Sequence, residues 1–391
     1  MTETLSHPAP PAPRRTVRIN AGAIATTIAC VLPVFLVGGL AVQMGDDLGF
    51  TPARLGLAVS VYFGVSALAS VPSGALVERY GSAVVARGGI LLSAGSLLAV
   101  AGLARSYPVL VVLLALSAAA NALGQLASNA ALARHVPAHR QGLSFGLKQA
   151  AIPVSTLLAG AAVPTVALTA GWRWAFVVAA LAALAALPAV PPAERDRVRR
   201  AAGRAGRATT ALVVVGVAAT LAAAAANALG TFVVDSAAGR GLSPALAGLT
   251  LTLGSAVCVA ARVGAGWLAD RRETGHVALI AGMLVVGAVG LALLAVSGPV
   301  PLVAGVVLGF GLGWAWPGLM NFAVVRLHPQ APAAATSITQ TGVYAGGCVG
   351  PLGLGAIADL AGYPAMWGTA AAAMLLAALC MLIGSRLLSR P

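Results

Sequence analysis

The segment Gly74-Ala-Leu-Val-Glu78-Arg79-Tyr-Gly81 directly follows a long apolar run. A related segment, Gly266-Trp-Leu-Ala-Asp270-Arg271-Arg272, follows another apolar run at an offset of 192 residues. Both segments begin with a glycine and place a carboxylate beside an arginine. Glycine permits tight turns and close helix approach, and a carboxylate can cap a helix N-terminus and pair with the arginine. The two segments therefore predict equivalent turns between helices in two parts of one chain.

The composition is that of a membrane protein. Of the 391 residues, 59% are hydrophobic and 9% are charged, and the mean hydropathy is +0.93. A soluble domain carries about 25% charged residues. The four cysteines all lie in apolar stretches, which excludes a secreted disulfide scaffold. The net charge of +14 is spread over the gaps between apolar runs, so we expect no nucleic-acid partner.

Apolar runs of about 20 residues, the length that crosses a bilayer, recur along the whole chain. They lie at 20–44, 55–77, 83–104, 108–132, 142–168, 174–192, 210–234, 245–267, 275–297, 300–325, 333–358 and 364–386. The sequence therefore predicts an all-α membrane protein with twelve transmembrane helices. A β-barrel would instead require alternating segments of about ten residues.

The offset of 192 residues also relates other positions. It pairs Gly49 with Gly241, Pro52 with Pro244, Asn129 with Asn321 and Arg134 with Arg326. We predict two pseudo-symmetric six-helix halves, 20–192 and 210–387, joined by a cytoplasmic linker at 193–209. Tails are expected at 1–19 and 388–391. Parallel repeats of this kind favour a transporter whose site lies between the halves, near the midplane.

Arginine accounts for 23 of the 24 basic residues, and its distribution predicts the orientation through the positive-inside rule. With the N-terminus inside, eighteen arginines fall on the cytoplasmic side. Four arginines, Arg54, Arg105, Arg173 and Arg240, fall on the outer side. We therefore expect a multi-pass protein in the cytoplasmic (inner) membrane of a bacterium, surrounded by the lipid bilayer, with both termini cytoplasmic.

Over almost its whole length the sequence resembles the major facilitator superfamily. Residues 74–81 look like the family's G-x-L-x-D-R-x-G signature with Glu78 for aspartate, whereas the second copy has Glu273 in place of the last glycine. The resemblance implies the major facilitator fold and a conformational latch between the halves. It assigns gating, and not substrate contact, to Gly74, Glu78, Arg79, Gly81, Gly266, Asp270 and Arg271.

Charged groups at membrane depth need a reason to be there. None of the ten carboxylates lies near the middle of a run, but Lys148 and Arg262 lie within the fifth and eighth runs. Each would cost about 2.5 to 3.5 kcal/mol at a helix centre, so each should face a cavity or a partner. The resemblance implies that these spans face each other across a central cavity, where the two cations could clamp an anion. The alternatives are that Lys148 snorkels and that Arg262 joins helices through carbonyls.

Uncharged polar residues that could orient a small ligand accompany the two cations. Asn121, Gln125 and Asn129 share one face of the fourth span, because residues four apart lie on the same side of a helix. The candidate substrate-binding residues are Tyr62, Asn121, Gln125, Lys148, Gln149, Asn227, Arg262, Gln340 and Tyr344. The alternative for each amide is that it ties helices together in lipid.

These features predict a secondary active transporter that moves a small organic or inorganic anion by alternating access. The stretch 142–149 is similar to the cyanate-permease-like branch of the superfamily. The proton is the candidate coupling ion, and a monomer is expected. The alternative is a proton-coupled drug or metabolite exporter that uses Asp46, Asp47 or Asp235. The chain has no Walker loop, and its histidines lack metal-ligand spacing, so we expect no enzyme activity, cofactor or metal.

Overall fold

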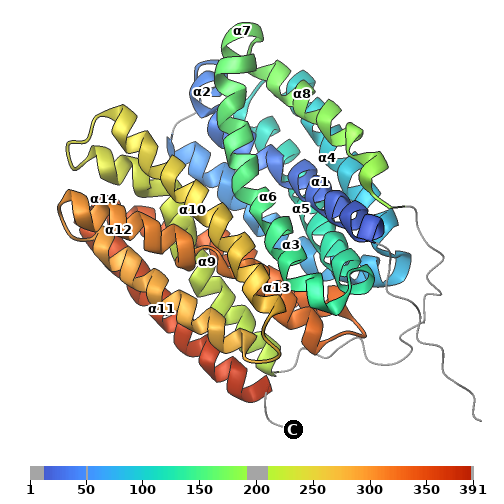
Figure 1. Cartoon of the computed structure of the whole chain (residues 1–391). Coiled ribbons are helices and arrows are strands. Elements are labelled where there is room, and N and C mark those ends of the chain that lie inside the picture. Colours follow the sequence, from blue (N-terminus) through green and yellow to red (C-terminus); the bar gives the residue numbers. More distant parts are fainter. Residues whose placement is uncertain (1–12, 50–51, 192–209, 389–391) are drawn as a thin grey trace, which may run out of the picture.

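The computed structural model describes residues 13–49, 52–191 and 210–388 (Figure 1). The first half contains α1 (Pro13–Gly39), α2 (Ala41–Leu48), α3 (Pro52–Tyr80), α4 (Ser82–Leu103), α5 (Tyr107–His135), η1 (Ala138–Arg140), α6 (Gln141–Ala162), η2 (Val163–Ala167), α7 (Leu168–Ala170), α8 (Trp172–Ala185) and η3 (Leu187–Ala189). Helix α1 begins at Pro13, inside the predicted tail. The rest of that tail, the linker at 193–209 and residues 389–391 lie outside the described residues.

The second half repeats this order of long helices. It contains α9 (Thr210–Ala238), α10 (Pro244–Asp270), α11 (His276–Leu294), α12 (Pro299–Leu308), η4 (Gly309–Gly313), α13 (Trp316–Leu327) and α14 (Pro332–Leu388). Two clusters of buried apolar side chains form the core; each comes mainly from one half, and the second-half cluster extends to Leu132 and Phe145 of the first half. Figure 1 shows the first half, coloured blue to green, beside the second half, coloured yellow to red.

The number of membrane crossings agrees with the prediction. Eleven helical stretches of the described chain are long and apolar enough to span a membrane. The last of them, α14, consists of two helices that meet at Gly362, whose φ of 81° and ψ of 167° are not helical. Glycine is favoured there because a side chain would strain this backbone conformation. Counted as two arms, α14 completes the twelve crossings and confirms the all-α fold.

The sequence repeat is also visible in the backbone geometry. Gly49 and its repeat mate Gly241 both have positive φ, at 60° and 86°. In the first copy of the quoted segment, Gly81 has a φ of 85° and precedes α4. The second copy has Glu273 at the equivalent position, and the left-handed turn is made instead by Gly275, with a φ of 79°, before α11. The turn is therefore kept although the glycine has moved.

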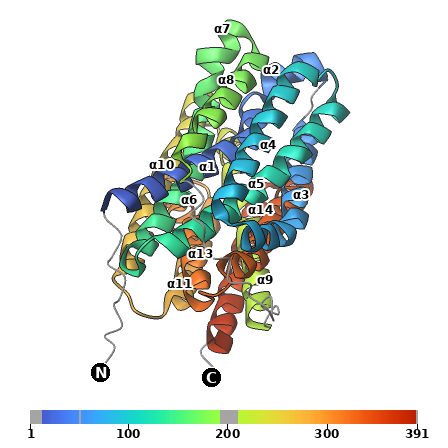
Figure 2. The same ribbon diagram turned by 90° about the vertical axis from the view of Figure 1, so that its right-hand side faces the viewer.

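The two halves meet mainly through α3 against α14 and through α6 against α10 and α13. Where α6 crosses α10, Gly142 faces Gly266: a Cβ on Gly142 would lie 2.5 Å from the main-chain oxygen of Gly266. We call the end of the molecule that carries residues 74–81 and 266–272 the motif side. The opposite end carries α2 and α7, at the top of Figure 2. Glycine at both positions allows the halves to close together on the motif side.

We expect Gly266→Ala to destabilise the protein, because the added methyl group would overlap the main-chain oxygen of Gly142. Gly264→Ala on the same helix is the matched control, since its Cβ would meet no atom within 4 Å. Removing a helical glycine there stabilises by up to about 1 kcal/mol. Thermal unfolding in detergent should therefore give a lower melting temperature for G266A than for G264A. Equal melting temperatures would contradict the tight crossing.

Candidate functional site

Lys148 lies on α6 in the protein interior, with none of its surface exposed. Its ammonium donates to Oε1 of Gln125 and, at 2.9 Å, to Oδ1 of Asn129. These two amides lie one turn apart on α5, which is the shared face that the sequence predicted. The amide nitrogen of Asn129 has no hydrogen-bond partner. Lys148 is therefore held by neutral dipoles inside the first half and does not snorkel to the surface.

Arg262 on α10 is also buried, with 2% of its surface exposed, and it binds main-chain oxygens. Its Nη1 donates to the carbonyl of Gln149 at 2.5 Å, while Nε and Nη2 donate to the carbonyl of Trp314 at 3.3 and 3.0 Å. Gln149 belongs to the first half, so this guanidinium ties the two halves together. The geometry is the helix-joining alternative that the sequence had left open for Arg262.

Both acceptor carbonyls lie where the helical hydrogen-bond ladder is interrupted. Pro153 lies inside α6 and has no N–H group, so the carbonyl four residues earlier, that of Gln149, lacks its usual helical donor. Trp314 lies between the π-helical turn η4 and α13, which has Pro317 in its first turn. Irregular backbone at membrane depth must find polar partners. Arg262 supplies the hydrogen-bond donors for the carbonyls at both breaks.

The two cations approach the same part of α6, because Arg262 binds the carbonyl of Gln149, the residue that follows Lys148. Among the described residues, the carboxylates lie at or near helix ends, at Asp47, Glu78, Asp235, Asp270, Glu273 and Asp359. Within the described part of the chain, the positive charges of Lys148 and Arg262 therefore have amide and carbonyl dipoles as their only partners. Burying charge in this way is unfavourable unless a counter-charge can enter. The region is suited to receive an anion.

A second polar cluster lies around Asn121, one turn before Gln125 on α5. Asn121 donates to the hydroxyl of Ser66 on α3 at 3.4 Å. The Tyr344 hydroxyl lies beside the side-chain amides of Asn121 and Gln340. Tyr344 and Gln340 both belong to the first arm of α14, and both are buried. This cluster lies between the two halves, on the side of the interface where α3 meets α14, but the Tyr344 hydroxyl has no hydrogen-bond partner there.

Tyr62 and Asn227 use their polar atoms elsewhere. The Tyr62 hydroxyl donates to the main-chain oxygen of Cys30 on α1 at 3.2 Å, and the Asn227 amide donates to that of Ala223 on its own helix at 2.7 Å. The described contacts thus divide the sequence candidates into three sets. Gln125 and Gln149 contact the two cations, Lys148 and Arg262. Asn121, Gln340 and Tyr344 form the second cluster. Tyr62 lies near Tyr344 but donates to α1, and Asn227 lies outside both sets.

Glu78 and Asp270 cap helices, and each capped helix belongs to the opposite half. Glu78 accepts a hydrogen bond from the main-chain N–H of Ala333, in the first turn of α14, at 2.9 Å. Asp270 accepts from the N–H groups of Gly142 and Leu143, in the first turns of α6, at 2.6 and 2.8 Å. Carboxylates are stabilised at helix N-termini. The sequence predicted the caps, and the resemblance implied a latch between the halves; the structure identifies the capped N-termini as those of α14 and α6.

The prediction that the motif carboxylate pairs with the arginine next to it is wrong for Glu78. Glu78 forms its ion pair with Arg134, at the end of α5. Arg79 is exposed and lies over a neighbouring tyrosine ring, and Arg271 lies 3.6 Å over the ring of Trp267. The sequence contained one signal for Arg134, because the repeat offset pairs it with Arg326. In the structure, Arg326 acts electrostatically on Asp270, the repeat mate of Glu78.

The acids considered for the exporter alternative lie away from this region. Asp47 accepts a hydrogen bond from Nε1 of Trp172 at 2.8 Å, which ties α2 to α8 at the end opposite the motif side. Asp235 is exposed near the end of α9. The side chain of Asp46 lies outside the described residues. The contact of Asp47 fits a structural role, so these positions do not favour the exporter.

Comparison with known proteins places this fold in a family. The profile of the Major Facilitator Superfamily matches residues 23–351 and, in a second alignment, residues 215–391. The E. coli fucose:proton symporter has a TM-score of 0.74 at 15% identity, covering 97% of this chain and 100% of that one. A proton:xylose symporter bound to 6-bromo-6-deoxy-D-glucose scores 0.76 at 16% identity, covering 95% and 96%. A human organic anion transporter scores 0.70 at 17% identity, covering 95% and 100%. The sequence has no significant match among curated proteins.

We expect Glu78→Gln and Arg134→Gln each to weaken the contact between the halves. Because the two side chains pair directly, the double variant should lose less stability than the sum of the single losses. A coupling free energy of at least about 0.5 kcal/mol is expected from a double-mutant cycle. The measurement is the free energy of unfolding in mixed detergent micelles.

The control for this cycle is Arg79→Gln, at the exposed neighbouring arginine. Surface changes of this kind alter stability by about 0.5 kcal/mol or less. Additive losses in E78Q and R134Q, or a coupling of Glu78 to Arg79 as large as that to Arg134, would contradict the ion pair described above.

Proposed function

Since the chain belongs to the major facilitator superfamily of membrane transporters, we propose that it moves a small organic or inorganic anion by alternating access. The observation that carries this proposal is the pair of buried cations, Lys148 from the first half and Arg262 from the second. Their partners are neutral amide and carbonyl groups. A bound anion would give each cation the counter-charge that these dipoles do not provide.

The surroundings of Lys148 are suited to a ligand of this kind. An ammonium has three hydrogen-bond donors, and the amide oxygens of Gln125 and Asn129 accept two of them. The free amide nitrogen of Asn129 is a further donor beside the ammonium. This group of hydrogen-bond donors is suited to bind a carboxylate or a small inorganic oxyanion. The similarity of residues 142–149 to the cyanate-permease-like branch also supports a small substrate.

Alternating access in this protein would require the motif side to open. That side is closed by the Gly142–Gly266 crossing and by the caps of Glu78 and Asp270 on helices of the opposite half. Rocking of the halves would break both caps together, because the repeat places them in equivalent positions. The distribution of arginine supports a cytoplasmic motif side in an inner membrane, and the structure would then be closed toward the cytoplasm.

The comparisons support parts of this proposal. Two of the similar structures are proton symporters, which supports the proton as the coupling ion, and the third transports organic anions. All of them support a small-molecule substrate. The described chain has no carboxylate beside Lys148 and Arg262. Coupling to a proton would therefore not use a midplane acid.

We expect Lys148→Gln and Arg262→Gln each to lower anion uptake at least tenfold, because either change removes one positive charge from the clamp. Lys148→Arg keeps the charge and should retain part of the activity. The measurement is the initial uptake of radiolabelled cyanate, formate, acetate and oxalate into proteoliposomes, with and without an imposed pH gradient.

The matched control is Thr252→Ala on α10, an exposed position whose hydroxyl bonds its own helix. It should transport like the unchanged protein. Uptake that is unaffected by both K148Q and R262Q would contradict the clamp. Drug efflux driven by a proton gradient and lost in Asp47→Asn would instead favour the exporter.

A further inference from the structure

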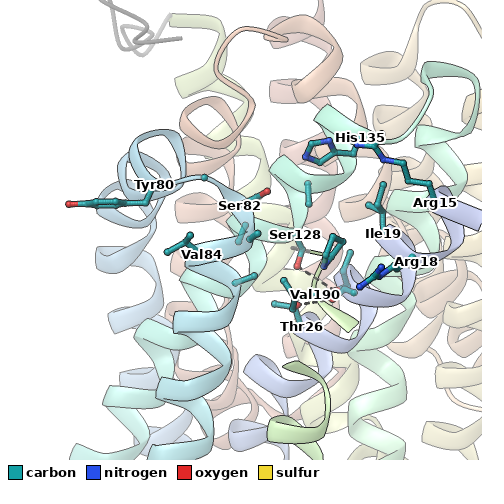
Figure 3. Close-up of a pocket in the computed structure, with 18 residues that line it drawn as sticks. Arg15, Arg18, Ile19, Thr26, Tyr80, Ser82, Val84, Ser128, His135 and Val190 are labelled. Atoms are coloured by element: carbon teal, nitrogen blue, oxygen red, sulfur yellow. Dashed lines mark hydrogen bonds between the residues drawn. The ribbon is translucent and has the colours of Figure 1, made fainter. Parts of the chain in front are cut away.

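A pocket of about 340 Å³ opens on the motif side of the first half (Figure 3). Its walls are the motif-side ends of α1 and α5, the turn from α3 to α4, and the residues that follow η3. All of its lining residues precede residue 192, so the pocket lies within one half. It is therefore separate from the anion site proposed between the halves.

The pocket has a cationic mouth and an apolar interior. Arg15 and Arg18 of α1 and His135 of α5 lie around the mouth, and none of the lining residues is acidic. Ile19 and Val190 line the interior together with several alanines. An anion with an apolar extension would match both parts of this lining.

Two of the hydroxyl groups that line the pocket, those of Thr26 and Ser128, are already used by the protein. Thr26 donates to the main-chain oxygen of Gly22 at 2.7 Å, and Ser128 donates to that of Ala23 at 3.4 Å. A ligand would therefore be recognised by charge at the mouth and by apolar contact inside.

One edge of the pocket bears the marks of a lipid-facing surface. Tyr80 and Val84 line it, and they are 51% and 50% exposed. Tyrosine is enriched at the membrane–water interface, where arginine attracts anionic headgroups. We propose that this pocket binds an anionic phospholipid, whose phosphate lies between Arg15 and Arg18 and whose glycerol and upper acyl region contacts the apolar wall.

The second half has kept only part of this lining. At the repeat offset, Arg18 corresponds to Thr210, Ser128 to Met320 and His135 to Leu327, whereas Arg15 corresponds to Arg207, which lies outside the described residues. The helices are equivalent, but the cation, the hydroxyl and the imidazole are absent at those positions. The lining is therefore a feature of the first half and not a general property of the repeated scaffold.

Because of where the pocket lies, a bound lipid would affect the motif side. Tyr80, Gly81 and Ser82 of its wall follow Glu78 closely in the chain, and His135 directly follows Arg134. A lipid that packs against both segments would hold the Glu78–Arg134 pair in place. Because a ligand favours the conformation that it binds better, this lipid would favour the closed motif side.

The test is lipid binding to the purified full-length protein in detergent, by native mass spectrometry and thermal unfolding. We compare dioleoylphosphatidylglycerol, dioleoylphosphatidylcholine and inorganic phosphate as probes. The anionic lipid should form a one-to-one adduct and raise the melting temperature by several degrees, since a ligand of the native state stabilises it. The zwitterionic lipid and phosphate should not.

Two variants locate the site. The double variant Arg15→Gln/Arg18→Gln and the variant His135→Leu, which takes the residue of the second half, should each weaken the one-to-one adduct at least fivefold. Arg272→Gln, an exposed arginine on the motif side outside the pocket, is the matched control and should bind as before. Unchanged melting temperatures without lipid would show that the variants are folded.

Three outcomes would overturn the proposal. Equal binding of both lipids would show that the headgroup charge is not recognised. Stabilisation by inorganic phosphate alone would show a soluble-anion site. Equal loss of binding in R272Q and R15Q/R18Q would show general attraction to a basic surface. These results do not depend on anion uptake, so this proposal and the transport proposal fail separately.

Discussion

The guanidinium of Arg262 must find hydrogen-bond acceptors in a region from which water is largely excluded, and much of the central architecture depends on where those acceptors lie. One is the carbonyl of Gln149, which Pro153 leaves without a helical donor; the other is the carbonyl of Trp314, at the break before α13. Gly146 allows α6 to lie against the main chain of Arg262. One buried cation thus binds the carbonyls at two helix interruptions, lies at a glycine contact and links the halves.

The carboxylates follow the opposite arrangement, because they lie near the surface. Glu78 and Asp270 lie at helix ends, and each caps the first turns of a helix in the other half. Glu78 and its partner Arg134 are 25% and 26% exposed on their side chains, so water can replace their contacts when the halves part. The cations at the centre have no such access. In the proposed mechanism, the contacts that would break thus lie near water, and the charges that would attract a substrate lie away from it.

The repeat and the twelve crossings were predictable because each depends on residue type at fixed spacing. Gly49 and Gly241, for example, are matched in sequence and share the same backbone conformation. The acceptors of Arg262 were harder to predict, because a main-chain carbonyl has no residue signature. Pro153 was an available signal, since a proline inside a helix identifies a carbonyl without its donor. Arg134 was also visible as the repeat mate of Arg326.

Other features could not be read from the sequence because they depend on the packing of the halves. Spacing along one helix does not tell which distant N-terminus Glu78 will cap, nor that Arg79 will point away from it. The arginines at 15 and 18 were interpreted as determinants of orientation. Only the folded first half brings them to the same pocket as His135 and the turn at Gly81.

The departures from symmetry constrain where an anion could bind. The repeat mate of Lys148 is Gln340, and that of Arg262 is Ser70, whose hydroxyl bonds the main chain of its own helix. The α6–α10 contact therefore carries two buried positive charges, whereas the equivalent α3–α14 contact carries none at these positions. An anion drawn to this field would lie toward α6 and α10, away from the pseudo-symmetry axis. The neutral amides and tyrosine of the other contact could then orient the uncharged part of the substrate.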